Sequence, residues 1–401
     1  MWNKVLRFKN DRRGTLAVLF AVSLYPILMM ICAAVDLSRH SQQQARLQAA
    51  LDAAALFVAR LVADGKAPTD LSAAARNFVL GNVSPSEMTN VTVTATMDST
   101  NVRVSGTGQI NPVMANILSA SDLTISGVAG ATWRTKKIEL VLVLDNTGSM
   151  SSSGKMSALK TAAKNLIDTM ASVANKPDAV RIGIVPFDVQ VRVGTTYRNA
   201  SWLTYSNSGT NSGSWTGCVA DRDQSHDVAD TTPTTSTPST LFPARNCANS
   251  NLTSIMPLST DWTALKAKVD AMSPAGNTNV TIGLVWGMHM LTANEPLTTA
   301  RTLVQEPDLE RIIILLTDGN NTQNRWTTNG TSIDARTDLA CTNTKANGIR
   351  LYTIRVIDGD AALLRRCATT TSMFYDVRTA SELVPVFQRI AAEIGQLRLT
   401  Q

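Results

Sequence analysis

Oxygen-bearing side chains follow two strand patterns and occupy one loop of this sequence. Residues 136–150 (KKIELVLVLDNTGSM) and 311–319 (RIIILLTDG) each contain a mostly apolar run bounded by charges, which is typical of a strand buried on both faces of a parallel sheet. Both runs end in polar residues, and residues 273–279 (SPAGNTN) form a polar loop between them. The candidate site residues are Asp145, Thr147, Ser149, Thr278 and Asp318.

The chemistry that these residue types could do is the binding of a hard cation. A carboxylate and two hydroxyls at alternate positions can converge on one ion if the loop is tight, which Gly148 permits. Ligand sites of open α/β sheets lie at the C-terminal ends of strands, where these side chains stand. Mg²⁺ prefers such oxygen ligands, and Mn²⁺ and Ca²⁺ are the alternatives. An isolated motif of this kind would have a simpler meaning, a polar turn that caps the next helix.

In order along the chain, the DxTxS strand end, the GNTN loop and the LLTDG strand end resemble the metal-ion-dependent adhesion site of von Willebrand factor A domains. The resemblance covers about residues 136–397. It implies that all five candidate residues bind the cation, directly or through water. Thr147 stands where that family more often has Ser, and the hydroxyl is kept. The resemblance also implies a protein partner whose carboxylate completes the shell of the cation.

The segments around these runs predict an α/β fold with a doubly wound, mostly parallel sheet, as in von Willebrand A and Rossmann-like domains, over residues 136–401. Apolar residues at helical spacing alternate along the chain with short apolar runs. A strand at 180–193 leads into an antiparallel partner. The other predicted elements are helices at 155–174, 262–272, 280–292 and 381–397 and a strand at 351–356.

Two polar stretches interrupt this pattern. Residues 195–258 are rich in Ser, Thr, Asn and Gly, where a compact domain would use a short connection. Long loops on rigid scaffolds often carry binding function, and the alternative is a solvated decoration of low order. Residues 320–331 follow the Asp318 strand and are predicted to rim the metal face.

An uncharged segment at residues 14–35 predicts a transmembrane helix, because about 22 apolar residues can cross a hydrocarbon core of ~30 Å. The basic residues within 1–13 predict a cytoplasmic N-terminus and a periplasmic C-terminal part, in a protein that crosses a bacterial inner membrane once. A cleaved signal peptide has a shorter apolar core, and the buried helix of a soluble protein seldom stays uncharged for so long. A retained anchor is therefore the preferred interpretation.

Residues 36–135 predict a small α+β module of the kind found in pilins. Residues 37–62 continue the apolar segment as an amphipathic helix. Alternating runs at 90–98, 101–110 and 122–133 predict a small antiparallel sheet. A spacer with no further function is the alternative for this module.

The N-terminal segment carries a second resemblance. The string RRGTLAVLFAVSLYPILMMICAAVD, followed by QQQARLQAALDAAAL, is similar to the start of TadG-like proteins of the tight-adherence (Flp) pilus system. The match covers about the first 60 residues. It implies a role in pilus assembly and contacts with subunits of a pilus or secretion machine.

Four of the five cysteines fall in the predicted exported part. An even count there predicts disulfide bonds, and sequence order favours Cys218–Cys247 and Cys341–Cys367 among the three connectivities that four cysteines allow. A zinc site is the alternative, but the sequence has no CxxC motif and no nearby pair of histidines. Cys32 lies in the apolar segment and is predicted to be inert.

Composition and motifs argue against several classes of function. The net charge of +6 comes partly from the basic N-terminus, and the other basic residues are dispersed, so nucleic-acid binding is not expected. No GxSxG, P-loop, Rossmann glycine or HExxH motif is present, so an enzyme, including a hydrolase, is not expected. Asp188 could act as a base, although a surface or supporting carboxylate is the preferred interpretation. His40, His226 and His289 are each isolated in the sequence and assigned structural roles.

Together these features predict a membrane-anchored, metal-dependent protein-binding component of pilus assembly. Its exported A-type domain would contact a partner carboxylate through a bound divalent cation. A surface adhesin that binds a host or matrix protein is the alternative function.

Overall fold

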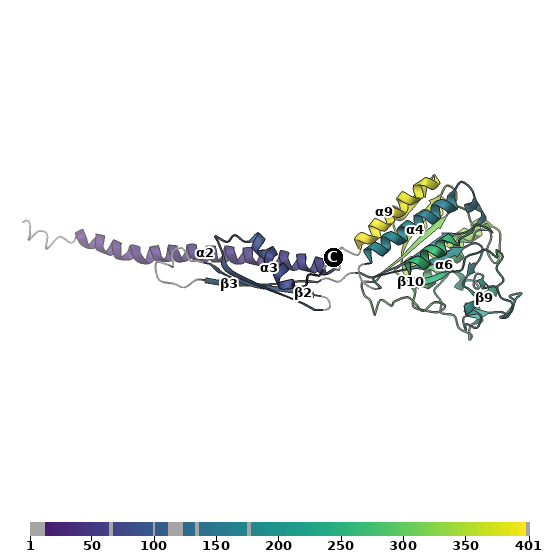
Figure 1. Ribbon diagram of the computed structural model, residues 1–401, viewed down its shortest axis with the longest axis horizontal. Coiled ribbons are helices and arrows are strands. Elements are labelled where there is room, and N and C mark those ends of the chain that lie inside the picture. The colour runs from purple at the N-terminus through teal and green to yellow at the C-terminus, as the bar shows by residue number, and fades with distance from the viewer. Residues whose placement is uncertain are drawn as a thin grey trace, which may run out of the picture. The chain divides into compact units, whose positions relative to one another are not determined.

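A computed structural model describes residues 13–63, 67–98, 101–110, 123–132, 136–174 and 178–397 of the chain (Figure 1). The chain forms two compact units, Met1–Arg134 and Thr135–Gln401, and each is described by itself. Nearly all of the predicted cytoplasmic segment 1–13 lies outside the described residues, as do residues 99 and 100 between the first two strands.

One helix, α2 (Arg13–Ala63), runs without interruption through the predicted transmembrane segment and the amphipathic segment that follows it. Between Val18 and Val35 its apolar side chains are mostly exposed. Within the described part of the chain, α2 is the one helix that is long and apolar enough to cross a membrane, by length and composition. A continuous exposed apolar surface of this length suits a lipid environment.

The second half of α2 packs on a three-stranded antiparallel sheet, and the short helix α3 (Leu71–Asn82) packs beside it. Leu51 is fully buried between α2 and the sheet. A Cβ on Gly106 or Gly127 would come within 2.9 or 2.8 Å of the methyl groups of Leu51, so the close approach of the helix depends on glycine at both positions. The strands, in spatial order, are β1 (Thr89–Met97), β2 (Asn101–Ile110) and β3 (Leu123–Thr132).

Side chains from the two helices bond to both edges of this sheet. Gln44 and Gln48, one turn apart on α2, donate from Nε2 to the carbonyl oxygens of Ser126 (2.8 Å) and Val128 (2.9 Å) on the edge strand β3. On the other edge, the hydroxyl of Ser72 on α3 accepts from the N–H (2.9 Å) and donates to the carbonyl (3.3 Å) of one β1 residue. Open backbone groups on an edge can pair with another chain, so these contacts protect the sheet.

The C-terminal unit is built on a sheet whose central strands are all parallel. Its six main strands follow the order β10-β5-β4-β11-β12-β13, and β10 runs antiparallel to β5. Numbered along the chain, this is the 3-2-1-4-5-6 order of a doubly wound sheet, which confirms the predicted fold class and its antiparallel edge. The strands are β4 (Ile138–Asp145), β5 (Val180–Phe187), β10 (Met256–Ser259), β11 (Glu310–Thr317), β12 (Arg350–Val356) and β13 (Phe374–Val377).

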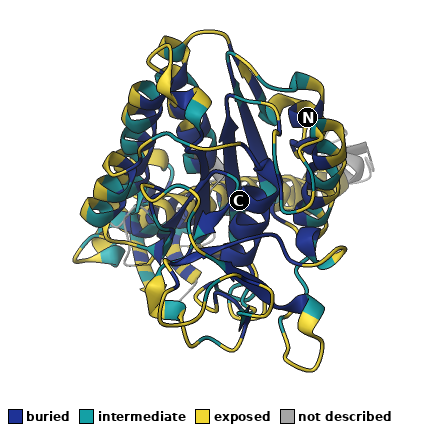
Figure 2. Ribbon diagram, turned by 90° about the vertical axis from the view of Figure 1, so that its right-hand side faces the viewer, coloured by how far each residue is buried: buried dark blue, intermediate teal, exposed yellow. Residues whose placement is uncertain are grey.

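Helices cover both faces of this sheet, and Figure 2 shows the buried strands between them. Along β4, Leu142 packs into one layer and Val143 into the other. The β4 run is not wholly apolar, because Glu139 is buried in it and is paired with Arg181 and Arg301. The first layer holds α4 (Lys155–Val173), α5 (Trp262–Asp270) and α9 (Leu383–Leu397), and the second holds α6 (Val280–Leu291), α7 (Gly330–Ala346) and α8 (Ala361–Cys367).

Residues 195–258 form a packed extension of the fold, so the alternative of a solvated decoration of low order was wrong. Trp202, Trp215 and Phe242 of this segment are buried in the same core as Trp286 of α6. These few aromatic residues are widely spaced among polar ones, so no periodicity in the sequence reveals their burial. Short strands continue the sheet into this segment: β6 (Val191–Arg192) directly before it, and β7 (Leu203–Thr204), β8 (Cys218–Val219) and β9 (Phe242–Arg245) within it.

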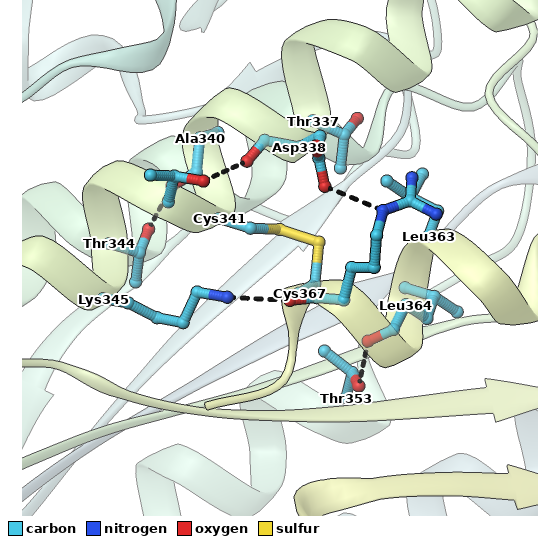
Figure 3. The surroundings of a disulfide bond; sticks show 12 residues. Thr337, Asp338, Ala340, Cys341, Thr344, Lys345, Thr353, Leu363, Leu364 and Cys367 are labelled. Atoms are coloured by element: carbon cyan, nitrogen blue, oxygen red, sulfur yellow. Dashed lines mark hydrogen bonds and ion pairs between the residues drawn. A yellow bond between two sulfur atoms is a disulfide. The ribbon is translucent and has the colours of Figure 1, made fainter. Parts of the chain in front are cut away.

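The predicted disulfide bonds are present, and they join the pairs that sequence order favours. Cys218–Cys247 closes a loop within the extension, and Cys341–Cys367 joins α7 to the last residue of α8 (Figure 3). Beside the second bond, Lys345 of α7 donates from Nζ to the carbonyl of Arg366 (2.7 Å). The two helices are therefore linked by a covalent bond and a hydrogen bond. Cys32 is the free cysteine among the described residues.

We expect Leu51→Ala to destabilise the N-terminal unit by about 2–5 kcal/mol, because the cavity would lie between a helix and two glycine-bearing strands that cannot close it. Hydrogen exchange of the β2 and β3 amides in the full chain measures this loss. Leu56→Ala on the same helix is the control, since Leu56 is 67% exposed. Equal protection of these amides in the two variants would contradict the packing described.

Candidate metal centre

Asp145 is the last residue of β4 and is fully buried. Its carboxylate oxygens have separate partners: Oδ1 accepts from the N–H of Thr147 (2.8 Å), and Oδ2 accepts from the hydroxyl of Thr317 (2.6 Å). Thr317 ends β11, which is parallel to β4 and adjacent to it. The two strand ends with polar residues in the sequence therefore meet at one place.

Thr147 and Ser149 lie in the tight turn after β4, where the 3-10 helix η2 (Gly148–Ser151) begins. Their hydroxyl oxygens are 3.0 Å apart. The Ser149 hydroxyl also donates to Oδ1 of Asp318 (2.6 Å), which directly follows β11. A chain of hydrogen-bonded oxygens thus runs from Thr147 through Ser149 to Asp318.

The loop that carries Thr278 lies against the same turn. The N–H of Gly148 donates to the carbonyl of Gly276 (3.0 Å), and the N–H of Ala275 donates to the carbonyl of Asn146 (2.9 Å). Gly276 has a φ of +88°, a conformation that favours glycine. Two backbone hydrogen bonds therefore hold this loop beside η2.

Gly319 leaves space beside the hydroxyls of Ser149 and Thr278. A Cβ at this position would lie 3.4 Å from Ser149 Oγ and 3.5 Å from Thr278 Oγ1. The two hydroxyls therefore border the same small volume, and Asp318 stands next to it in the chain. The structure brings all five predicted ligands together, at the C-terminal ends of β4 and β11 and the N-terminal end of α6.

Lys155, which no motif indicated, is part of this cluster. It is the first residue of α4, its side chain is 4% exposed, and its Nζ forms an ion pair with Oδ2 of Asp318. Helical spacing places it on the same face of α4 as Leu159, Ala162 and Leu166, which are all buried. From that spacing alone, the burial of the Lys155 side chain could have been predicted.

Burial and mutual repulsion raise the pKa values of two carboxyl groups here. Burial, with a further contribution from the nearby Asp318, raises the pKa of Asp145 to about 6. Burial, with a smaller contribution from Asp145, raises the pKa of Asp188 to about 7. Both groups would be more easily ionised with a cation beside them, because a nearby positive charge stabilises the charged form.

Asp188 is a supporting carboxylate, and the surface position considered for it was wrong. It is fully buried, and a Cβ on Gly276 would lie 3.1 Å from its Oδ2. Its Oδ1 accepts from the N–H of Gln190 (2.8 Å), and its carbonyl accepts from the N–H of Asn279 (3.1 Å). Its backbone therefore bonds to the loop that carries Thr278, while its carboxylate bonds within its own turn and lies against Gly276.

Two insertions also contact this loop. The buried carboxylate of Asp221, from residues 195–258, accepts from Nδ2 of Asn279 (3.1 and 3.0 Å) and from the N–H of Arg325 (3.1 Å). Thr322, from residues 320–331, exchanges two hydrogen bonds with the backbone of Thr278 (2.8 and 2.9 Å). Sequence motifs did not indicate these contacts, since each joins residues far apart in the chain.

His289 is not isolated in space. It is fully buried on α6, with Nδ1 3.1 Å from Oδ1 of Asp230 and Nε2 3.3 Å from a guanidinium nitrogen of Arg222. Burial lowers the pKa of His289, although the hydrogen bond to Asp230 acts in the opposite direction. Both partners belong to residues 195–258, so His289 helps to hold that segment on α6.

The donor set of this cluster fits a hard cation. It consists of two carboxylates and three hydroxyls, all oxygen ligands of the kind that Mg²⁺ prefers. Glycine at position 319 keeps space free that a larger residue would fill. No three His, Cys, Asp or Glu side chains form a metal-binding group in the described ranges, so a cation here would depend on the hydroxyls and on water.

Comparison with known proteins places part of the chain in a family context. Residues 14–61 match the family model described as putative Flp pilus-assembly TadE/G-like. No curated protein matches the chain in sequence.

Three solved structures are similar to this chain at low sequence identity. The pilus adhesin SpaC from Lactobacillus rhamnosus GG is 15% identical, with 79% of this chain and 36% of that chain covered and a TM-score of 0.43. The vWF domain of the type V pili tip protein Mfa5 from Porphyromonas gingivalis is 13% identical (67% and 98% covered, TM-score 0.42). Proximal thread matrix protein 1 from the mussel byssus, with a zinc-occupied MIDAS motif, is 15% identical (64% and 47% covered, TM-score 0.38). The chain thus spans about a third of SpaC and half of the mussel protein.

We expect the affinity for Mg²⁺ to fall as the pH drops below about 6, because a proton then competes for the buried carboxylate of Asp145. Isothermal titration of the full chain in detergent at pH 7.5, 6.5 and 5.5 measures the change. An affinity that stays constant over this range would contradict a role for Asp145 in cation binding.

The same pKa shift predicts how the stability of the metal-free protein depends on pH. The folded state keeps its proton on Asp145 up to about pH 6, whereas the unfolded chain releases it near pH 4. The folded state thus binds more protons in this window, so this group's contribution to stability falls as the pH rises from 4 to 6. Asp145→Asn should reduce that slope in thermal unfolding without metal; an unchanged slope would contradict the shift.

Proposed function

We propose that this protein is a membrane-anchored component of pilus assembly that binds a protein partner through a divalent cation, with Mg²⁺ as the first choice. The observation that carries the proposal is that oxygen-bearing side chains from three chain segments lie together. The Ser149 hydroxyl bonds to Thr147 and Asp318, and the hydroxyls of Ser149 and Thr278 both flank Gly319. When bound, the cation would supply a coordination position for a carboxylate oxygen of the partner. Asp145, Thr147, Ser149, Thr278 and Asp318 would hold it, directly or through water.

Two features of the chain support pilus assembly as the role. Residues 14–61 match a family model whose description refers to Flp pilus assembly. The same residues belong to the apolar helix α2, which suits a membrane anchor. Subunits of the pilus or of its secretion machine are therefore the partners that we propose.

The proposed location is the bacterial inner membrane, with the N-terminus in the cytoplasm and the C-terminal unit in the periplasm. Basic residues before the apolar helix favour this orientation. Two disulfide bonds in the C-terminal unit agree with it, because such bonds persist in oxidising compartments.

Protease added to spheroplasts should therefore degrade the C-terminal unit, and protection of this unit from the protease would contradict the orientation.

We propose no catalytic activity for the cluster. The Ser149 hydroxyl donates to Asp318, the Thr147 hydroxyl faces that of Ser149, and within the described residues no hydrogen bond joins a hydroxyl of the cluster to a histidine. The Asp188 carboxylate accepts from the N–H of Gln190 in its own turn, and in the part of the chain that the structure describes no hydrogen bond joins it to a hydroxyl of the cluster. Binding is thus the function that this geometry supports best.

We expect Asp145→Ala to abolish Mg²⁺ binding while the C-terminal unit stays folded. The variant removes a charge that is repelled by Asp318, and it leaves the Thr317 hydroxyl and the Thr147 N–H without their acceptor. The second effect costs about 1–3 kcal/mol for each unsatisfied group, and the Thr317 hydroxyl keeps a longer contact with the carbonyl of Gly319 (3.3 Å), so a domain of this size tolerates it. Titration calorimetry measures binding, and circular dichroism reports folding.

Asp168→Ala is the matched control, because Asp168 lies on the surface of α4 in an ion pair with Lys266. It should bind Mg²⁺ like the wild type. Equal heats of Mg²⁺ binding for the wild type and Asp145→Ala would refute the proposed centre. Capture of pilus subunits that persists in EDTA would refute the bridging role of the cation.

A further inference from the structure

The ion pair between Lys155 and Asp318 is buried as deeply as the core of the domain. The exposed fractions of the two side chains are 4% and 0%. The Asp318 carboxylate is shared, since Oδ1 accepts from the Ser149 hydroxyl and Oδ2 contacts the Lys155 ammonium. The lysine therefore touches one predicted cation ligand directly, and a second predicted ligand bonds to the other oxygen of the same carboxylate.

The position of Lys155 is unfavourable by local criteria. A positive charge in the first turn of a helix is repelled by the helix dipole, and a buried ammonium loses its hydration. An uncharged side chain of similar length could fill the same volume beside Leu159 without either cost. The local cost indicates that the charge itself serves the neighbouring carboxylates.

The charge balance of the centre shows how the lysine charge affects the cation and the carboxylates. Asp145 and Asp318 together carry two negative charges, which a divalent cation alone would neutralise. Lys155 adds a third positive charge, so the loaded centre holds one more positive charge than it would with a neutral residue at this position. If Asp188 is also ionised, the net charge of the loaded centre falls by one both with lysine and with a neutral residue at position 155. The two centres still differ by one positive charge.

We propose that Lys155 sets the charge of the metal centre, weakening its hold on the cation and leaving the loaded centre able to accept a carboxylate from a partner. This inference rests on the proposed function and adds a residue that determines its specificity for an anionic group. Without the cation, the same lysine offsets the repulsion between Asp318 and Asp145, which are close enough to raise the pKa of Asp145. Lys155 is thus a positioning residue that acts through Asp318.

The test compares Lys155→Gln with the wild type in the full chain, purified in detergent. Glutamine keeps a hydrogen-bond donor for Asp318 and removes the charge. We expect Lys155→Gln to bind Mg²⁺ roughly tenfold more tightly, since a unit positive charge several ångströms from the cation is gone. Lys155→Met also removes the charge but keeps an unbranched side chain of similar length, and it should tighten Mg²⁺ binding as Lys155→Gln does, which a role in hydrogen bonding or packing alone would not predict.

Acetate serves as the probe for the carboxylate. Replacing chloride by acetate at about 0.1 M should tighten Mg²⁺ binding to the wild type, because binding of the two ligands is linked. The effect should be at least about threefold smaller in Lys155→Gln, whose loaded centre attracts an anion less. Lys164→Gln is the matched control on α4, since Lys164 pairs with Asp270 on the surface, and it should behave like the wild type.

A second comparison uses Asp318→Asn, alone and combined with Lys155→Gln, and the double variant has no unpaired buried charge. Asp318→Asn leaves Lys155 without its partner and should bind Mg²⁺ weakly, whereas the double variant with Lys155→Gln carries a neutral pair and should bind more tightly than Asp318→Asn. One outcome would overturn this inference but not the proposed function. In that outcome the wild type binds Mg²⁺, Lys155→Gln binds it no more tightly than the wild type, and the double variant binds it no more tightly than Asp318→Asn. Absence of Mg²⁺ binding by the wild type would overturn the proposed function and this inference with it.

Discussion

The C-terminal unit depends on one electrostatic constraint, two buried carboxylates at the ends of adjacent parallel strands. Asp145 and Asp318 are both inaccessible to solvent, and their proximity raises the pKa of Asp145 to about 6. Two like charges in a poorly polarisable interior are unfavourable unless hydrogen bonds and positive charges accompany them. The surrounding residues supply these groups, and their arrangement follows from that requirement.

Hydroxyl groups and one ammonium group surround the two carboxylates. Thr317 donates to Asp145, while Ser149 donates to Asp318 and Lys155 pairs with it. The loop before α6 is held in place by the turn after β4 and by both insertions. The long polar insertion therefore helps to hold this site, since its buried Asp221 accepts from Asn279, which caps the N-terminus of α6.

The N-terminal unit meets a different requirement. Its sheet is too small to cover itself, so α2 and α3 bury one face and bond to both edges. The glycines beside Leu51 allow the close contact with α2. The same helix includes the apolar segment, so one element provides both the packing of this unit and an apolar surface long enough to cross a membrane.

Sequence alone determined the strands β4, β5, β11 and β12, the helices α4, α5, α6 and α9, and the identity of the candidate ligands, because periodicity and strand-end motifs are local properties of a chain. It also favoured the cysteine pairs that the structure joins. It did not indicate α7, α8, β10 or β13, which the structure adds. Only the tertiary structure decided that Lys155 reaches Asp318, 163 residues away, and that Asp221 supports the Thr278 loop. These contacts depend on which strands are neighbours and on how helices pack over them, and that information is spread over the whole core and contained in no single motif.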